Sequence, residues 1–476
     1  MGAVLLSFSA LGQTNGPKAL LLDEMGRVVE VPTNQLPSAL QPNETNWIRQ
    51  LPTPVKGASM APELLERFRK EPRKFEWFPG TQPLLMPYLA SQDELGNTAL
   101  RPGALIPVSP LEMVIQPAKY WLSDYGLRYS LQQTLTYVTM TGVDKGANNL
   151  GYYTLDFQGK WAVYSAPDPG MAGWVSTHVE AKTGLGASGE KEDARKNIGS
   201  ITDPTGIWSD VNGIRVPELA WQQSARDGEI VLVAGVVNQG DYIDQNAYAQ
   251  SGRSHFMNSA LITSEVLPEP KYNFGLNLQW QPLDEWYAMA GWSAGDNGAG
   301  YAPWTDFSLN NWWLIGEFGY APRDFLGLGP GIFRAQPFFA EVGGSTGGGL
   351  CFNLQQQLGE KSPFGWFGRF GFGGEDVSAD AGAQIGTGFI WQGPMKHLLL
   401  QRTSNDLLGV AVVWSQPNST TKTIYHENEY VLETFYSMQL LPTLKLTPDF
   451  QYVEHPAYNG KHDHSFVFQI QLALAW

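Results

Sequence analysis

The sequence has only one cysteine, Cys351, so no disulfide can form within the chain and no cluster of thiolates can hold a metal. It also lacks an uninterrupted apolar run of about 18 residues, the length that a membrane-spanning helix needs. Basic residues are few, because 31 lysines and arginines stand against 46 aspartates and glutamates, for a net charge of −15. That charge argues against nucleic acid as a partner.

Glycine and aromatic residues, in contrast, are plentiful. The chain has 52 glycines, 17 tryptophans, 19 tyrosines and 23 phenylalanines. This composition suits many tight turns and belts of tryptophan and tyrosine at the two faces of a membrane. A transmembrane β-barrel is compatible with the absence of long apolar runs, because only every second residue of each strand faces lipid.

The stretch His464–Trp476 shows the two-faced pattern of a strand most clearly, since side chains of a strand alternate between its faces. In a soluble sheet the apolar face would lie in a core, whereas in a transmembrane barrel it faces lipid. The aromatic residue at the end of this strand favours the barrel. The apolar face carries Phe466, Phe468, Ile470, Leu472, Leu474 and Trp476, and the other face carries Ser465, Val467, Gln469, Gln471, Ala473 and Ala475.

After Trp121, similar stretches recur between turn signals without a fixed repeat period. The fold class that we expect is all-β, a closed antiparallel transmembrane β-barrel of about 16 strands with a proline-rich N-terminal extension. The predicted strands are Tyr129–Val138, Tyr152–Ala162, Gly173–Lys182, Arg215–Ser224, Glu229–Val237, Tyr272–Gln281, Trp286–Gly295, Asn311–Tyr320, Gly331–Val342, Gly349–Leu358, Phe364–Gly374, Ala381–Gln392, Leu407–Ser415, Glu427–Leu440, Leu444–Val453 and His464–Trp476.

Two further patterns favour a pore. In the strand Tyr152–Ala162, Asp156 and Lys160 lie on the face opposite Phe157 and Trp161. Charges in a dry core are costly unless they are paired, but they cost little in a water-filled lumen. The connections also alternate, with short turns such as 225–228 and 441–443 at one end and long loops such as 183–214 and 238–271 at the other. This asymmetry is typical of outer-membrane barrels.

The N-terminal part of the chain has a different character. Residues 1–12 are expected to be the remnant of a signal peptide, with an apolar core and small residues before Gln13. Residues 13–120 are expected to form a proline-rich periplasmic extension, because 13–117 holds 15 of the 32 prolines. One helix is predicted there, at Pro62–Phe75. Residues 121–476 then form the barrel.

Two ordered series of short motifs resemble a known family. The first series is Arg215–Gln223, the Asp227-Gly228 turn, Val233–Val237, Asp241–Asp244 and Phe256–Ser259, and the second is Glu429–Tyr436 followed by Leu446–Tyr452. From about Trp121 to Trp476 the chain resembles the carbohydrate-selective porin (OprB-type) family of bacterial outer membranes.

This resemblance implies a 16-stranded barrel that admits small mono- or oligosaccharides by passive diffusion, with long extracellular loops folded inward to narrow the channel. It implies a transporter and not an enzyme, without cofactor or metal. The expected partners are small carbohydrates, outer-membrane lipid and the barrel-insertion machinery, which reads a C-terminal aromatic strand similar to the one ending at Trp476. The oligomeric state stays open between monomer and trimer.

The candidate site residues are groups that can replace water around sugar hydroxyls, or aromatic faces that can cover a pyranose ring. We rank Arg215 and Glu218 first, because a guanidinium can bind vicinal hydroxyls or a neighbouring carboxylate. For each residue the alternative is a polar lumen wall without substrate contact. Strand parity selects Asp156, Lys160, His178, Glu180, Lys182, Glu218, Asn277, Glu433, Lys445 and Asp449, and the long loops contribute Asp241, Asp244, Arg253, Trp304 and Asp306.

Three motif matches carry little weight. Gly184–Gly189 fits the dinucleotide-binding pattern G-x-G-x-x-G, but no helix and second parallel strand follow it. Gly343–Gly347 fits G-x-S-x-G, but a strand follows instead of a helix, so a glycine turn is the better interpretation. His455, His462 and His464 lack the fixed spacing of a metal site.

Two other functions fit parts of the pattern. The acidity of the chain also suits a general diffusion porin that prefers cations. A soluble secreted β-sandwich, either a lectin or a glycosidase, is an alternative of another class. A glycosidase would need two carboxylates about 5–10 Å apart in a cleft.

Overall fold

The computed structural model describes residues 6–8, 18–22, 28–32, 105, 115, 118 and 122, and the chain from 127 to 476 with short gaps. The predicted helix Pro62–Phe75 and the loop residues Trp304 and Asp306 lie outside the described residues. The gaps are residues 167–170, 186–192, 206–212, 227–228, 250–252, 254, 270–271, 284, 296–307, 360–361, 375, 396–405, 419–422 and 442.

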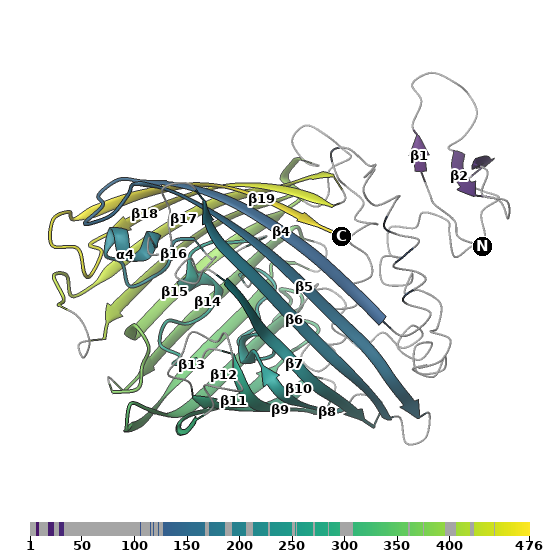
Figure 1. Cartoon of the computed structure of the whole chain (residues 1–476), viewed down its shortest axis with the longest axis horizontal. Helices are drawn as coiled ribbons and strands as arrows, with labels where there is room; N and C mark the ends of the chain where they lie inside the picture. The colour runs from purple at the N-terminus through teal and green to yellow at the C-terminus, as the bar shows by residue number, and fades with distance from the viewer. Residues whose placement is uncertain are drawn as a thin grey trace.

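Strands β4 to β19 form one closed antiparallel barrel, and each pairs with its neighbours in the chain (Figure 1). The predicted barrel of 16 strands is thus confirmed, and every predicted strand overlaps an observed one. Their bounds are β4 Leu127–Met140, β5 Asn149–Ala166, β6 Met171–Leu185, β7 Gly213–Ala225, β8 Ile230–Val237, β9 Asn273–Leu283, β10 Trp286–Gly295, β11 Ser308–Tyr320, β12 Gly331–Val342, β13 Ser345–Gln357, β14 Phe364–Gly373, β15 Ala381–Gln392, β16 Leu407–Pro417, β17 Glu429–Leu441, β18 Leu444–Glu454 and β19 His464–Ala475.

The barrel closes where the last strand meets the first. β19 pairs with β4 along its length, from Val467 opposite Met140 to Ala475 opposite Gln132. The backbone amide of Leu131 donates to the carbonyl of Trp476 at 2.9 Å. Closure leaves no unpaired strand edge, which a sheet in lipid could not tolerate.

The two faces of the strands differ as the sequence predicts. On β19, Phe468 and Ile470 are each 42% exposed on the outside, whereas Gln469 and Gln471 are at most 1% exposed and point inward. The same alternation places Leu278 and Phe389 outside and the amide groups of β9 inside. A compact soluble sandwich would bury these apolar side chains, so this alternative is wrong.

Outside the barrel, three short strands form a separate sheet, β1 Leu6–Phe8, β2 Lys18–Leu22 and β3 Val28–Pro32. None of these three stretches was predicted to be a strand. In the loops lie helices α4 (Ala194–Ile198) and α5 (Ser259–Ile262) and the turn η3 (Gln239–Asp241). Within the described residues, no helix is long and apolar enough to cross a membrane.

The β12–β13 connection settles one of the motif matches. Val342 pairs with Ser345, so the turn consists of Gly343 and Gly344 alone. Their φ angles of 59° and 88° lie in the left-handed region, which two glycines adopt without strain. The G-x-S-x-G match is therefore a hairpin turn, as predicted.

A substitution on the outward face tests directly whether this face contacts lipid. An arginine near the bilayer midplane of a barrel costs about 2–4 kcal/mol. Leu278→Arg, at the centre of β9, should therefore lower the free energy of unfolding by that amount, measured by urea titration in lipid vesicles. Gln158→Arg, on the inward face of β5, should change it little. Equal losses in the two variants would contradict the assigned faces.

Candidate functional site

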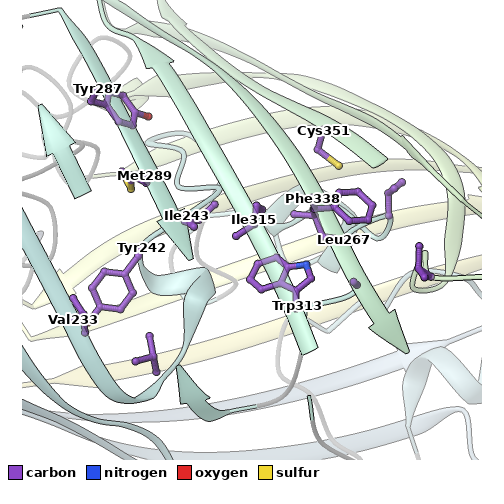
Figure 2. Packing of buried hydrophobic residues seen from close by; sticks show 14 of the residues in the cluster. Val233, Tyr242, Ile243, Leu267, Tyr287, Met289, Trp313, Ile315, Phe338 and Cys351 are labelled. Atoms are coloured by element: carbon purple, nitrogen blue, oxygen red, sulfur yellow. The ribbon is translucent and has the colours of Figure 1, made fainter. Parts of the chain in front are cut away.

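The described part of the loop between β8 and β9 runs inside the barrel. We call these residues, 238–249, 253 and 255–269, the inner loop. Its apolar side chains Tyr242, Ile243 and Leu267 belong to one buried cluster with the inner wall, as Figure 2 shows. The wall side of this cluster comes from β8, β10, β11, β12 and β13, and it includes Val233, Tyr287, Met289, Trp313, Ile315, Phe338 and Cys351.

Two charged wall residues fix the backbone of the inner loop. The guanidinium of Arg369 on β14 donates to the carbonyls of Asp244, Ala249 and Leu261. The carboxylate of Glu433 on β17 accepts the backbone amides of Met257 and Asn258. Buried backbone groups need such partners, because an unpaired one costs about as much as a lost hydrogen bond. The wall therefore holds a non-regular loop in place.

Glycines on the inner wall make room for this loop. A Cβ on Gly365 of β14 would lie 2.2 Å from the ring of Tyr248, and one on Gly409 of β16 would lie 2.3 Å from the ring of Phe435 and 2.9 Å from that of Phe256. The high glycine content was expected to serve turns. Some of the glycines instead lie on the inner wall, where the absence of a side chain leaves room for rings of the inner loop.

A second segment, residues 193–205 after β6, also lies against the inner wall; we call it the α4 segment. Glu429 on β17 accepts a hydrogen bond from the Ser200 hydroxyl at 2.6 Å and from the Ile201 amide at 2.9 Å. Gln451 on β18 donates to the carbonyl of Pro204 at 2.8 Å. Gln469 on β19 donates to the same carbonyl, and α4 lies against β4. Together the two segments cover the inner wall from β8 to β18 and part of β19 and β4.

The predicted charged residues of β5 to β7 gather on the remaining wall. Asp156 is 1% exposed, and its carboxylate contacts His178 Nε2 at 3.0 Å. Its other oxygen lies 2.7 Å from Nη2 of Arg253, which comes from the inner loop and is 23% exposed. This ion pair therefore joins the inner loop to β5.

The adjacent residues complete the cluster. Glu180 on β6 lies 2.6 Å from the ammonium of Lys182 and 3.0 Å from the guanidinium of Arg215 on β7. The guanidinium also lies over the ring of Tyr272, 4.9 Å from its centroid. We call the whole set the charged cluster: Asp156, His178, Glu180, Lys182, Arg215 and Arg253.

The two residues ranked first, Arg215 and Glu218, do not pair with each other. A register shift in the β6–β7 ladder places Arg215 opposite Glu180 and Glu218 opposite His178. The carboxylate of Glu218 instead accepts a hydrogen bond from the hydroxyl of Tyr242 at 3.0 Å. Both residues face inward, but they have different partners.

The other predicted residues have structural partners. Lys160 lies near Gln222, and Asn277 donates to Gln239 of the inner loop at 3.0 Å. Asp449 accepts from Gln451 at 3.0 Å and from Gln469 at 3.2 Å, and Lys445 is half-buried on β18. The loop carboxylate Asp244 contacts Arg369, and Asp241 ends η3.

The wall residues that bind loops at long range were not among the predicted site residues. Arg369, Glu429 and Gln384 lie at inward positions, and Gln384 accepts the backbone amide of Glu265. Strand parity marks all three as inward-facing. It does not reveal their loop partners, which lie more than a hundred residues away in the chain.

A stripe of polar groups on β19, β4 and β5 lies beside the charged cluster. The hydroxyls of Thr134 and Thr154 face each other across the β4–β5 ladder, and Thr154 is opposite Lys182 on β6. Among the described residues, the oxygens Thr134 Oγ1, Thr154 Oγ1, Gln469 Oε1 and Gln471 Oε1 are buried without a hydrogen-bond partner from the protein. Such groups are suited to bind water or a polar solute.

Comparison with known proteins agrees with this architecture. The model of the "Carbohydrate-selective porin, OprB family" matches residues 171–341 and 336–474. Porin AaxA of Chlamydia felis is 26% identical over 311 residues, which cover 62% of this chain and 65% of that protein. Porin AaxA of Chlamydia caviae is 24% identical over 329 residues, which cover 65% and 67%. The chain spans about two thirds of the length of these relatives.

One solved structure shares the fold. The high-pH structure of Pseudomonas putida OprB superimposes with a TM-score of 0.61 at 14% sequence identity, over 76% of this chain and 97% of that one. At this level of identity the likeness concerns the fold of the barrel.

The close approach of Tyr248 to Gly365 predicts how the inner loop can be displaced. Gly365→Ala places a methyl group against the ring of Tyr248, so the loop should move away from β14. We expect a changed single-channel conductance in planar bilayers and faster proteolysis of the loop. Gly316→Ala, on the outward face of β11, meets only an ordinary contact 3.5 Å away and should behave like the parent protein. Identical conductance and proteolysis in the Gly365 variant would refute the packing role of this glycine.

Proposed function

This chain belongs to the carbohydrate-selective porin family of OprB type, and from that membership we propose that it conducts small carbohydrates by passive diffusion across a bacterial outer membrane. The observation that carries the proposal is the inner loop, which occupies one side of the lumen and leaves polar groups on the other. A solute would pass between the inner loop and the wall formed by β19 and β4 to β7.

The groups along this path suit a sugar. Each ring hydroxyl both donates and accepts hydrogen bonds, so the path must offer both roles. Carboxylate, amide and hydroxyl oxygens accept, and guanidinium and ammonium groups donate. Because both carboxylates of the charged cluster are already paired with basic side chains, a neutral solute exchanges water for these groups without leaving a carboxylate unpaired. Weak binding of this kind permits passage.

The ion pair between Arg253 and Asp156 is the narrow point of the proposed path. It is the contact by which the inner loop reaches the β5 wall, and the Arg253 side chain remains 23% exposed. A solute has to pass beside this pair. The pair would therefore limit the size of the sugars that enter.

Passive sugar transport needs no nucleophile and no cofactor. The test is the swelling of liposomes that contain the purified barrel, with glucose, sucrose and amino acids of matched size. We expect glucose to enter faster than an amino acid of equal size. Entry rates set by size alone would identify a general diffusion pore instead.

The narrow point makes a separate prediction. Arg253→Ala removes the contact across the lumen, so sucrose should enter several-fold faster while glucose entry rises less, as measured by liposome swelling. Arg226→Ala is the matched control, because Arg226 lies in the turn after β7 and is 67% exposed. An unchanged ratio of sucrose to glucose entry in the Arg253 variant would show that the pair does not restrict the path.

A further inference from the structure

Three loops meet inside the barrel at the end where the long connections lie. The α4 segment and the inner loop are joined by two reciprocal hydrogen bonds of 2.8 Å, from the Ser259 amide to the Asp203 carbonyl and from the Asp203 amide to the Ser259 hydroxyl. The inner loop joins the β14–β15 connection, residues 374–380, where the Asp380 amide donates to the Glu265 carbonyl at 3.1 Å. We call this contact the loop junction.

Carboxylates outnumber cations at the loop junction. Arg195 of α4 forms an ion pair with Asp380, and Lys196 lies 3.4 Å from Asp193 but is 55% exposed. Asp203 and Glu265 are two further carboxylates at the junction. The other titratable groups that face the junction are Lys182 of β6, Glu429 of β17 and Tyr458 of the connection after β18.

Protonation of buried carboxylates lowers this excess of negative charge. Burial, together with the nearby Asp193 carboxylate, raises the pKa of Asp203 to about 7, while Arg195 opposes the shift. Burial also raises the pKa of Glu265 to about 7, against Arg195 and together with Asp380. Both carboxyls keep hydrogen bonds, Asp203 with the Thr205 amide at 2.9 Å and Glu265 with the Ser259 hydroxyl.

The direction of the pH effect follows from these shifts. Each pKa is higher in the packed junction than in water, where the ordinary values are 3.8 and 4.5. The packed junction therefore binds more protons than the open one. Its stability is greatest below about pH 4, falls as the pH rises, and reaches its lowest level above about pH 7.

We propose that Asp203 and Glu265 form a proton-operated latch that holds the inner loop and the α4 segment in the lumen. With both carboxyls protonated, the three loops stay packed and the path is narrow. When the protons leave, two buried carboxylates face Asp193 and Asp380, and the loops separate. The path then widens. The latch requires only that ions pass through the barrel, so it does not depend on sugar transport.

The test combines conductance with hydrogen exchange. The full chain in planar bilayers should show higher single-channel conductance at pH 8.5 than at pH 5.5. Backbone exchange in 193–205 and 255–269, corrected for its intrinsic pH dependence, should rise at least about tenfold relative to β18, the factor that one pKa unit contributes. The double variant Asp203→Asn with Glu265→Gln imitates the protonated state and should keep the pH 5.5 behaviour at pH 8.5.

Asp376→Asn serves as the matched control, because Asp376 is an exposed carboxylate in the same connection as Asp380. It should retain the parent pH dependence. Exchange in the parent protein can be read even if the double variant does not fold, which heat-modifiable gel migration would reveal. Equal conductance and exchange at the two pH values in the parent, or parent-like pH dependence in the folded double variant, would overturn the latch.

Discussion

The alternation of side chains in a closed sheet is the constraint on which this structure depends. Lipid cannot satisfy backbone hydrogen bonds, so the sixteen strands must close, and closure gives every strand one outer and one inner face. The outer face can be uniformly apolar. The inner face has to be polar where it contacts solute, and its side chains have to fit the loop where it packs against a loop. The inner loop divides the inner face into these two regions.

The alternation of side chains between the two faces also explains how much of the fold could be predicted from the sequence. All sixteen strands were predictable, because an apolar residue at every second position persists through β9, β18 and β19. Parity also placed Asp156, Glu180 and Lys182 on the inside. It failed for the partner of Arg215, because the shifted register between β6 and β7 aligns this residue with Glu180, and such a bulge leaves no periodic signal.

The positions of the loops could not be predicted from a single sequence, for a different reason. In the sequence, nothing distinguishes Gly365 and Gly409 from other glycines. Only the structure shows that Tyr248 and Phe256 pack against them. Likewise, the acidic net charge of the whole chain says little about the lumen. In the charged cluster, three basic side chains and His178 surround two carboxylates, so the local balance is opposite to that of the chain.

The central claim is that solutes pass along the stripe of β19, β4 and β5. Cysteine accessibility in a Cys351→Ser background measures it most directly, with Gln158→Cys at a half-buried position on the inner face of β5 and Leu155→Cys on the outer face. A membrane-impermeant thiol reagent should modify the Gln158 variant and reduce its conductance, and should leave the Leu155 variant unmodified. Modification of the Leu155 variant alone, or of the Gln158 variant without loss of conductance, would contradict the account.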